Sequence, residues 1–273
     1  MRAACIQLCS GVDVAQNIEQ ASALIRAAAG DGATLIATPE MTGLMQRKPN
    51  RLWESIAAQD DDLCVKSFSA LARELSITLL IGSLAIRTGE KRAANRSFLF
   101  GPDGAQIAIY DKIHLFDVSI SRAQTYRESA CYDGGAKAVC ADISAGDEAA
   151  KLGLTICYDV RFGPLYKVLA NAGAQIIAVP AAFTVPTGEA HWEVLLRARA
   201  IETGSFILAP AQGGEHEDGR STWGRSQIIG PWGETLAALS HDTPGYIIAD
   251  LDMEEVASAR SKIPAWQQNT PFN

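Results

Sequence analysis

The chain has 273 residues, of which 48% are apolar and 20% charged, and its 24 basic and 31 acidic side chains give a formal net charge of −7. That length allows one large domain or two small ones, and the balanced composition excludes disordered and collagen-like proteins. The negative charge argues against nucleic acid or an anionic membrane as the main partner, because both attract basic surfaces.

The sequence predicts neither a membrane anchor nor a secretion signal. No apolar run reaches the ~18 residues that span a bilayer. Gln7 and Asp13 interrupt the first apolar stretch before a signal peptide could form. Six cysteines without a Cys-x-x-Cys pair, and four widely spaced histidines, indicate core thiols rather than disulfides or a zinc site. We therefore expect a cytoplasmic protein that needs no metal and no organic cofactor.

Strand and helix patterns alternate along the chain. Short apolar, β-branched runs predict strands at 3–8, 33–38, 77–86, 95–100, 106–110, 151–156, 175–179, 206–210, 227–230, 234–238 and 246–251. Periodic apolar residues and capping signals predict helices at 14–28, 63–75, 164–172, 188–202 and from 252 to 264. The helix at 63–75 is expected to bury Leu63, Phe68, Leu71 and Leu75, and 113–150 is interpreted as mostly loop.

The order of these elements predicts an α/β protein. Turn signals at 101–104 and 231–233 each lie between two strands, so two hairpins and mixed sheets are expected. No linker, low-complexity segment or short repeat divides the chain, so we expect a single domain over 1–273.

Three polar residues stand where predicted strands end. Glu40 follows the strand at 33–38, Lys112 the strand at 106–110, and Cys157 the strand at 151–156. The carboxyl ends of strands are where sites lie in open α/β sheets, so the three side chains could share one cleft. Each residue taken alone is more simply explained as a core thiol or a surface charge.

A carboxylate, an ammonium and a thiol together suit one kind of chemistry. The ammonium favours the thiolate, which is the nucleophilic form of cysteine. The carboxylate can accept the thiol proton and later give it to a leaving amine. The cation and a backbone N–H can hold the oxyanion of a tetrahedral intermediate. Such a set suits amide hydrolysis through a thioester.

The residues around these three positions carry a family resemblance. Thr38–Glu40, Tyr110–Asp117 (YDKIHLFD) and Gly153–Phe162 (GLTICYDVRF) resemble the three signatures of the nitrilase superfamily of carbon–nitrogen hydrolases, in that family's order. The resemblance covers nearly the whole chain. It implies a four-layer α-β-β-α sandwich that pairs into a homodimer or a larger homo-oligomer, with the tail from about residue 265 in the dimer interface.

The same resemblance assigns roles to single residues. It implies that Glu40 is the general base, Lys112 the catalytic lysine and Cys157 the nucleophile. Glu128 matches the family's second glutamate, which orients the lysine and the substrate; its simpler interpretation is a loop carboxylate in solvent. The backbone N–H of Tyr158 would complete the oxyanion hole with Lys112.

The stretch from Ala190 to Glu202 resembles the Nit amidase branch, and within it the deaminated glutathione amidases more than the ω-amidases. Those enzymes act on amides of short acids with a 2-oxo acid end. Phe183 and Thr184 follow a predicted strand and are expected to line the pocket. Arg161 could hold a substrate carboxylate, although an ion pair with Asp159 or a glutamate is the more ordinary role.

Two segments depart from the branch, and both are expected to border the cleft. Residues 41–44 are Met-Thr-Gly-Leu instead of an aromatic-rich segment, and the loop between Asp117 and Glu128 lacks the usual Pro-Gly.

Alternatives to this interpretation stay open at the level of sequence. A nitrilase or an N-carbamoyl amino acid amidase of the same superfamily would use the same residues. A thiol hydrolase could pair Cys157 with His114, which lies two residues beyond Lys112 and would share its strand face. A catalytically silent binding module would keep the fold without the reaction.

Overall fold

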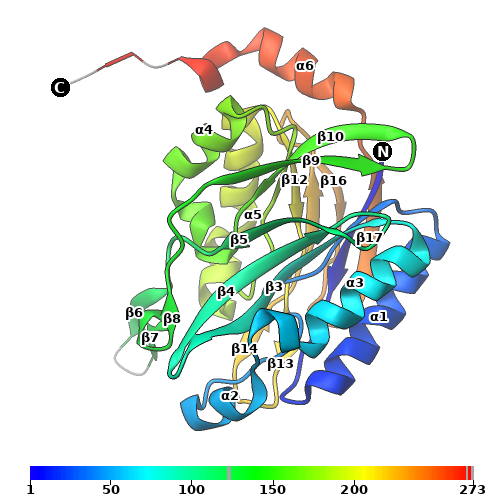
Figure 1. The fold of residues 1–273 in the computed structure, drawn as a ribbon. Helices are drawn as coiled ribbons and strands as arrows, with labels where there is room; N and C mark the ends of the chain where they lie inside the picture. The colour runs from blue at the N-terminus through cyan, green and yellow to red at the C-terminus, as the bar shows by residue number, and fades with distance from the viewer. Residues whose placement is uncertain (122–123, 269, 272–273) are drawn as a thin grey trace.

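The computed structural model describes residues 1–121, 124–268 and 270–271, and most of its strands form two large sheets (Figure 1). Both sheets are mixed, as predicted, because each joins parallel inner strands to antiparallel outer ones. The first sheet has the order β17 (Gly245–Asp250), β1 (Arg2–Gln7), β2 (Leu35–Ala37), β3 (Thr78–Gly89), β4 (Arg92–Phe100) and β5 (Gln106–Asp111), and β8 (Tyr132–Asp133) also pairs with β4.

The second sheet repeats this plan. It has the order β16 (Thr235–Ala238), β15 (Gln227–Ile229), β12 (Phe206–Ala209), β11 (Ile176–Ala178), β10 (Glu148–Leu154) and β9 (Val139–Ala145). Two small antiparallel pairs stand apart from the large sheets: β6 (Asp117–Ser121) with β7 (Gln124–Arg127), and β13 (Gly213–Glu215) with β14 (Ser221–Trp223).

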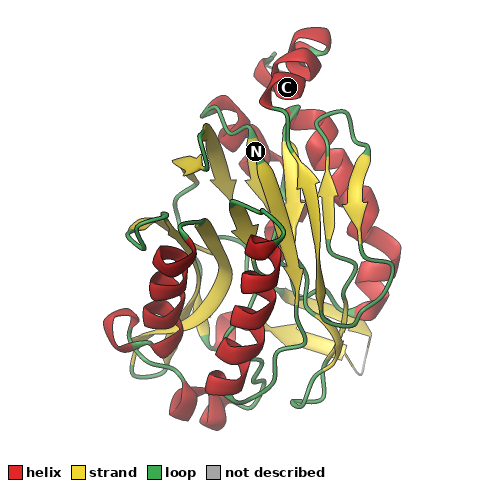
Figure 2. Ribbon diagram, turned by 90° about the vertical axis from the view of Figure 1, so that its right-hand side faces the viewer, coloured by secondary structure: helices red, strands yellow, loops and turns green. Residues whose placement is uncertain are grey.

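Helices cover the outer face of each sheet, so the layers follow the predicted α-β-β-α order (Figure 2). On the first sheet lie α1 (Val14–Gly30) and α3 (Leu63–Leu75), and on the second α4 (Gly163–Asn171) and α5 (Val185–Thr203). The remaining helical segments are α2 (Pro49–Ser55), α6 (Met253–Lys262) and the 3-10 turns η1 (Gln59–Asp61), η2 (Glu128–Ala130), η3 (Cys157–Arg161) and η4 (Pro264–Gln267).

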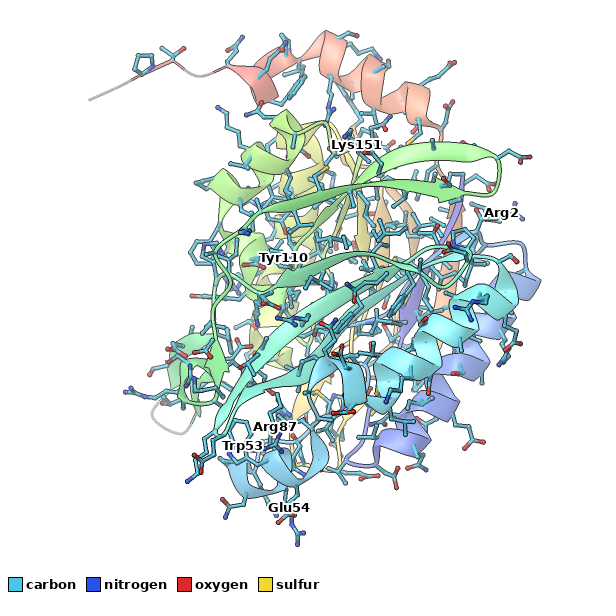
Figure 3. The ribbon with its side chains drawn as sticks, in the orientation of Figure 1. Arg2, Trp53, Glu54, Arg87, Tyr110 and Lys151 are labelled. Carbon is cyan, nitrogen blue, oxygen red and sulfur yellow. The ribbon has the colours of Figure 1, made fainter. Side chains whose placement is uncertain are left out.

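Successive side chains of a strand point to opposite faces of its sheet, so each strand contributes to two hydrophobic cores. In β2, Leu35 and Ala37 face the opposite sheet, whereas Ile36 packs under α1 and α3. Tyr110, labelled in Figure 3, lies between the layers and donates a hydrogen bond to Asp159 at 2.6 Å. The inter-sheet core therefore leads directly to the loops at the ends of β5 and β10.

Most predicted elements are present, and the differences have simple causes. Leu63 opens α3 but is 53% exposed, because only Phe68 and Leu71 of the predicted stripe face the sheet fully. The stretch 113–150 contains β6 to β9 instead of loop, and α2 was not predicted. Polar residues interrupt the apolar pattern of these elements, and β6, β7 and β8 are also short.

No helix among the described residues is long and apolar enough to cross a membrane.

Candidate active site

Glu40, Lys112 and Cys157 meet at one point of the structure. Glu40 lies in the loop after β2, Lys112 directly follows β5, and Cys157 begins η3 after β10. The Nζ of Lys112 is 2.8 Å from Oε1 of Glu40. The other carboxylate oxygen of Glu40 accepts a hydrogen bond from the N–H of Ala182 at 2.9 Å. Loops at the ends of both sheets thus bring an acid, an ammonium and a thiol together.

Glu128 completes this group instead of lying in solvent. Its Oε2 is 2.9 Å from Nζ of Lys112 and accepts a hydrogen bond from the N–H of Phe116 at 2.7 Å. Lys112 is 2% exposed and lies between two carboxylates. This placement matches a residue that orients the lysine.

Asn95 was not predicted from the sequence as a site residue. It bridges the carboxylates of Glu40 and Glu128 through hydrogen bonds. Its Nδ2 donates to Oε1 of Glu40 and to Oε1 of Glu128, each at 2.9 Å. The opposite assignment of the amide would turn its oxygen toward two carboxylates, so the nitrogen must face them. The signal in the sequence was weak: a single amide within β4, next to Arg96 and Ser97, with no motif around it.

The charges of this cluster depend on one another. Burial alone would raise the pKa of Glu40, but the charge of Lys112 and hydrogen bonds from Lys112, Cys157 and Asn95 hold it below its ordinary 4.5. Burial alone would lower the pKa of Lys112, but the carboxylates of Glu128 and Glu40 hold it well above 10.5. The resting site therefore contains an ionised Glu40 and a protonated Lys112.

Cys157 rests as a neutral thiol. Burial and the adjacent carboxylate of Glu40 raise its pKa well above 9.0, and Lys112 opposes this only in part. The sequence-based argument that the lysine favours the thiolate is therefore incomplete, because the carboxylate acts in the other direction. The thiol can instead lose its proton to Glu40 as it attacks a substrate.

The backbone at the thiol is constrained. Cys157 has φ of 51°, in the left-handed region that costs a non-glycine residue about 1 kcal/mol or more. Its N–H is tied to the carbonyl of Pro180 at 2.9 Å. Gly82 on β3 permits this approach of the two halves, because a Cβ there would lie 2.1 Å from the carbonyl oxygen of Thr38 and 2.4 Å from Pro180.

Asp159 links the loop of the lysine to the loop of the thiol. Its buried carboxylate accepts hydrogen bonds from the N–H of His114 at 3.0 Å, from Tyr110 at 2.6 Å and from the N–H of Ile156 at 2.9 Å. Nδ1 of His114 is also 2.7 Å from Asp159, and its ring stacks on Phe162. His114 therefore has a structural role in the loops that hold Lys112 and Cys157.

A cavity of about 220 Å³ opens in front of the cluster. The four residues predicted to touch substrate all line it: Tyr158, Arg161, Phe183 and Thr184. Met41 and Leu44, from the segment that departs from the family branch, also line it. The other departing loop falls partly on residues 122–123, outside the described residues.

Arg161 does not pair with Asp159, which corrects the more ordinary of its two predicted roles. The bonds of Asp159 are all made to other groups. The guanidinium of Arg161 lies over the rings of Tyr158 and Phe183, at 5.9 and 5.5 Å from their centroids, and 3.3 Å from Nδ1 of His191. Within the described ranges no carboxylate neutralises it, so its charge faces the cavity.

Two arginines on α5, within the stretch that resembles the amidase branch, make contacts that are structural. Arg197 pairs with Glu193 and donates to the carbonyl of Gly233, and Arg199 pairs with Glu202 and donates to the carbonyl of Val160. Among residues 1–121, 124–268 and 270–271, no group of three or more histidines, cysteines and carboxylates is placed to hold a metal ion.

Comparisons with known proteins show what the chain is similar to. A profile described as carbon-nitrogen hydrolase matches residues 2–261. The deaminated glutathione amidase of Synechocystis is 38% identical over 267 residues, which cover 97% of this chain and 96% of that protein.

Two solved structures extend the likeness to the fold. Nit3 of Saccharomyces cerevisiae, described as a member of branch 10 of the nitrilase superfamily, is 26% identical with a TM-score of 0.86, over 98% of this chain and 96% of that one. A Glu-to-Gln mutant of the amidase from Nesterenkonia has a TM-score of 0.79 and 26% identity over 97% and 98% of the two chains. In that structure acrylamide has added to the active-site cysteine.

Proposed function

The chain belongs to the carbon–nitrogen hydrolase family, and on that premise we propose that it hydrolyses the non-peptide C–N bond of a small carboxylate-bearing amide. The substrate resembles deaminated glutathione or is the ω-amide of a 2-oxo acid. The observation that carries the proposal is the buried Glu40–Lys112–Cys157 group at the wall of one cavity.

The reaction proceeds through a thioester. Glu40 takes the thiol proton while Sγ of Cys157 attacks the carbonyl carbon, and the carbonyl electron pair moves to oxygen. When the C–N bond breaks, the amine leaves with the proton from Glu40. Water then gives a proton to Glu40 and attacks the thioester carbon. The C–S bond breaks, and sulfur takes that proton back, which restores the resting site.

The oxyanion is held by Lys112 and by the backbone N–H of Tyr158. The ammonium is buried and fixed by two carboxylates, so it is already oriented before charge develops on the substrate. Within the described part of the chain, the N–H of Tyr158 donates to no other residue and is available to a ligand. Asn95 and Glu128 act as positioning residues, because they touch the catalytic groups and not the carbonyl.

Arg161 holds the carboxylate of the acyl part. Its charge is not neutralised by any described carboxylate, its guanidinium is oriented by two aromatic rings, and it follows the nucleophile by four residues. A guanidinium fork matches a carboxylate in two parallel hydrogen bonds. Phe183 and Thr184 complete the acyl side of the cavity.

A panel of amides tests the proposal. We expect release of ammonia or amine from deaminated glutathione and from 2-oxo acid ω-amides, and no release by Cys157→Ala. Matched nitriles and N-carbamoyl amino acids belong in the same panel, because preferred turnover of either would assign the other activities of the superfamily. Equal turnover by the native enzyme and Cys157→Ala would refute the mechanism.

The pH profile follows from the resting charges. Glu40 must be ionised, and its pKa lies below 4.5, so activity is lost only as the pH falls through that low value. Lys112 must be protonated and Cys157 is neutral, and both pKa values lie high, so the alkaline limb lies above pH 9. We therefore expect kcat/KM to stay level between about pH 5.5 and 8.5. A limb with its midpoint near neutrality would contradict these charges.

We also propose that two copies of the chain associate. Val168 on α4, Val194 and Ile201 on α5, Trp232 and Ile263 are 53–68% exposed and lie on or beside the outer helices of the second sheet. The segment η4 packs on α4 and α5, which places the tail beside this face. An exposed apolar face of this kind is typical of a protein interface.

Sedimentation velocity tests this association. We expect a native dimer, a monomer for Ile201→Glu, and an unchanged dimer for Leu63→Glu, which places the same charge on an equally exposed residue of α3. A native monomer would exclude the interface.

We propose a cytoplasmic location, because the cysteines form no disulfides. All six are unpaired, which is the usual state in a reducing compartment.

A further inference from the structure

The catalytic cavity continues into an outer groove. Arg47, which lies just before α2, and Pro49, the first residue of α2, line both the cavity and the groove. The other residues that line the groove are Lys48, Asn50, Arg51 and Asp218. Trp53 and Glu54, labelled in Figure 3, show where α2 lies, at the end of the molecule that carries β13 and β14 (Figure 1).

The groove is positive although the chain is acidic. It contains three cations and one carboxylate, whereas the formal charge of the chain is −7. Asp218 is held by Arg220, with Nε 2.7 Å from its Oδ2, and Arg51 pairs with Glu54 at 3.0 Å. Across the described parts of the chain, Arg47 and Lys48 have no acidic partner within 4 Å. Two cations are therefore left for a ligand.

The position of the groove relates it to one side of the scissile bond. In the proposed function, the acyl part of the substrate lies at Arg161 and Phe183. Glu40, Met41, Leu44 and Arg47 also line this cavity, and Arg47 lines the groove as well. We therefore place the leaving amine on the side of the cavity that opens into the groove. Glu40, which gives the amine its proton, lines the same cavity as Arg47. Ammonia as the leaving group would not reach the groove.

We propose that Arg47 and Lys48 bind the carboxylate of an amino acid or dipeptide leaving group. The inference rests on the proposed function and narrows its substrate class: the enzyme prefers a peptide-like amide with a terminal carboxylate to a simple ω-amide that releases ammonia. A carboxylate suits both cations, because arginine binds it through two hydrogen bonds and lysine as a point charge. The groove is open to water, so salt screens the effect.

Three substrates with one acyl group test the proposal. They are deaminated glutathione, its C-terminal carboxamide, and the corresponding ω-amide of ammonia. We expect kcat/KM for deaminated glutathione to exceed that for its carboxamide by about fivefold or more at low salt. In Arg47→Gln/Lys48→Gln this ratio falls to near one, and added salt lowers it in the native enzyme.

The matched control is Arg26→Gln/Lys66→Gln. It removes one arginine and one lysine from the exposed faces of α1 and α3, where neither residue lines the cavity or the groove. We expect it to keep the native ratio. A native ratio near one, or an unchanged ratio in Arg47→Gln/Lys48→Gln, would overturn the proposal.

Failure of the proposed function gives a different result. If none of the three amides is hydrolysed, the amidase assignment is wrong, and titration of Cys157→Ala with deaminated glutathione and its carboxamide then decides about the groove. Tighter binding of the carboxylate form, lost in the triple variant with Arg47→Gln/Lys48→Gln, supports the groove. Equal Kd values overturn it.

Discussion

Replacing Lys112 with alanine is expected to lower kcat about 10⁴-fold, because the substitution removes both a donor to the oxyanion and the charge that keeps Glu40 ionised. It also leaves Glu40 and Glu128 buried without their cation. Breaking a buried ion pair on one side costs about 3–5 kcal/mol. Steady-state kinetics and urea unfolding measure the two effects separately.

Lys112→Met keeps most of the side-chain volume, so a loss of activity in a folded Lys112→Met excludes simple unfolding as the cause. His114→Ala is the decisive comparison with a Cys–His hydrolase. His114 bonds to Asp159 and supports the site from beneath, so we expect a far smaller loss of kcat than for Lys112→Ala. Near-normal turnover in Lys112→Ala with collapse in His114→Ala would contradict the account.

Glu40→Gln is expected to abolish most amide hydrolysis while Cys157 remains reactive as a nucleophile. The amide keeps the shape of the carboxylate but neither accepts the thiol proton nor protonates the amine, so hydrolysis falls about 10³-fold or more. Glu40 raises the pKa of Cys157, so its removal lowers that pKa and favours the thiolate beside Lys112. Alkylation of Cys157 by acrylamide is therefore retained or becomes faster.

The Nesterenkonia amidase, in which acrylamide has added to the cysteine of a Glu-to-Gln mutant, is consistent with this separation. The measurement is the rate of Cys157 alkylation, followed by mass spectrometry, beside the rate of amide hydrolysis. Asp62→Asn is a matched control, because it makes the same kind of change in a buried carboxylate that caps α3 and does not line the cavity. Loss of alkylation together with hydrolysis in Glu40→Gln would contradict the pKa argument.

The parts of the site that the sequence predicts are those tied to strand ends. Glu40, Lys112 and Cys157 each follow an apolar run, and the carboxyl ends of these strands meet where the sheets face each other. Short apolar runs likewise predicted most of the strands of the two large sheets, whereas the order of the four layers followed from the family resemblance. Local patterns suffice where each residue belongs to a long periodic element.

The parts that could not be predicted depend on contacts between distant segments. Asn95 is one amide in the strand β4, and only the approach of Glu40 and Glu128, which are distant from it in sequence, gives it a role. Arg161 could pair with Asp159 in sequence, but Tyr110, His114 and Ile156 already saturate that carboxylate. Several donors from distant segments compete for one carboxylate, and the local sequence pattern does not show which of them binds it.

The central claim is that Cys157 carries the acyl group during turnover, and acid-quenched peptide mass spectrometry tests it most directly. With deaminated glutathione in steady state, we predict a covalent adduct on the peptide that contains Cys157. Its mass is that of the substrate less the leaving amine, and Cys157→Ala forms none. Undiminished hydrolysis without any adduct during the first turnover, or with the adduct on another cysteine, would contradict the account.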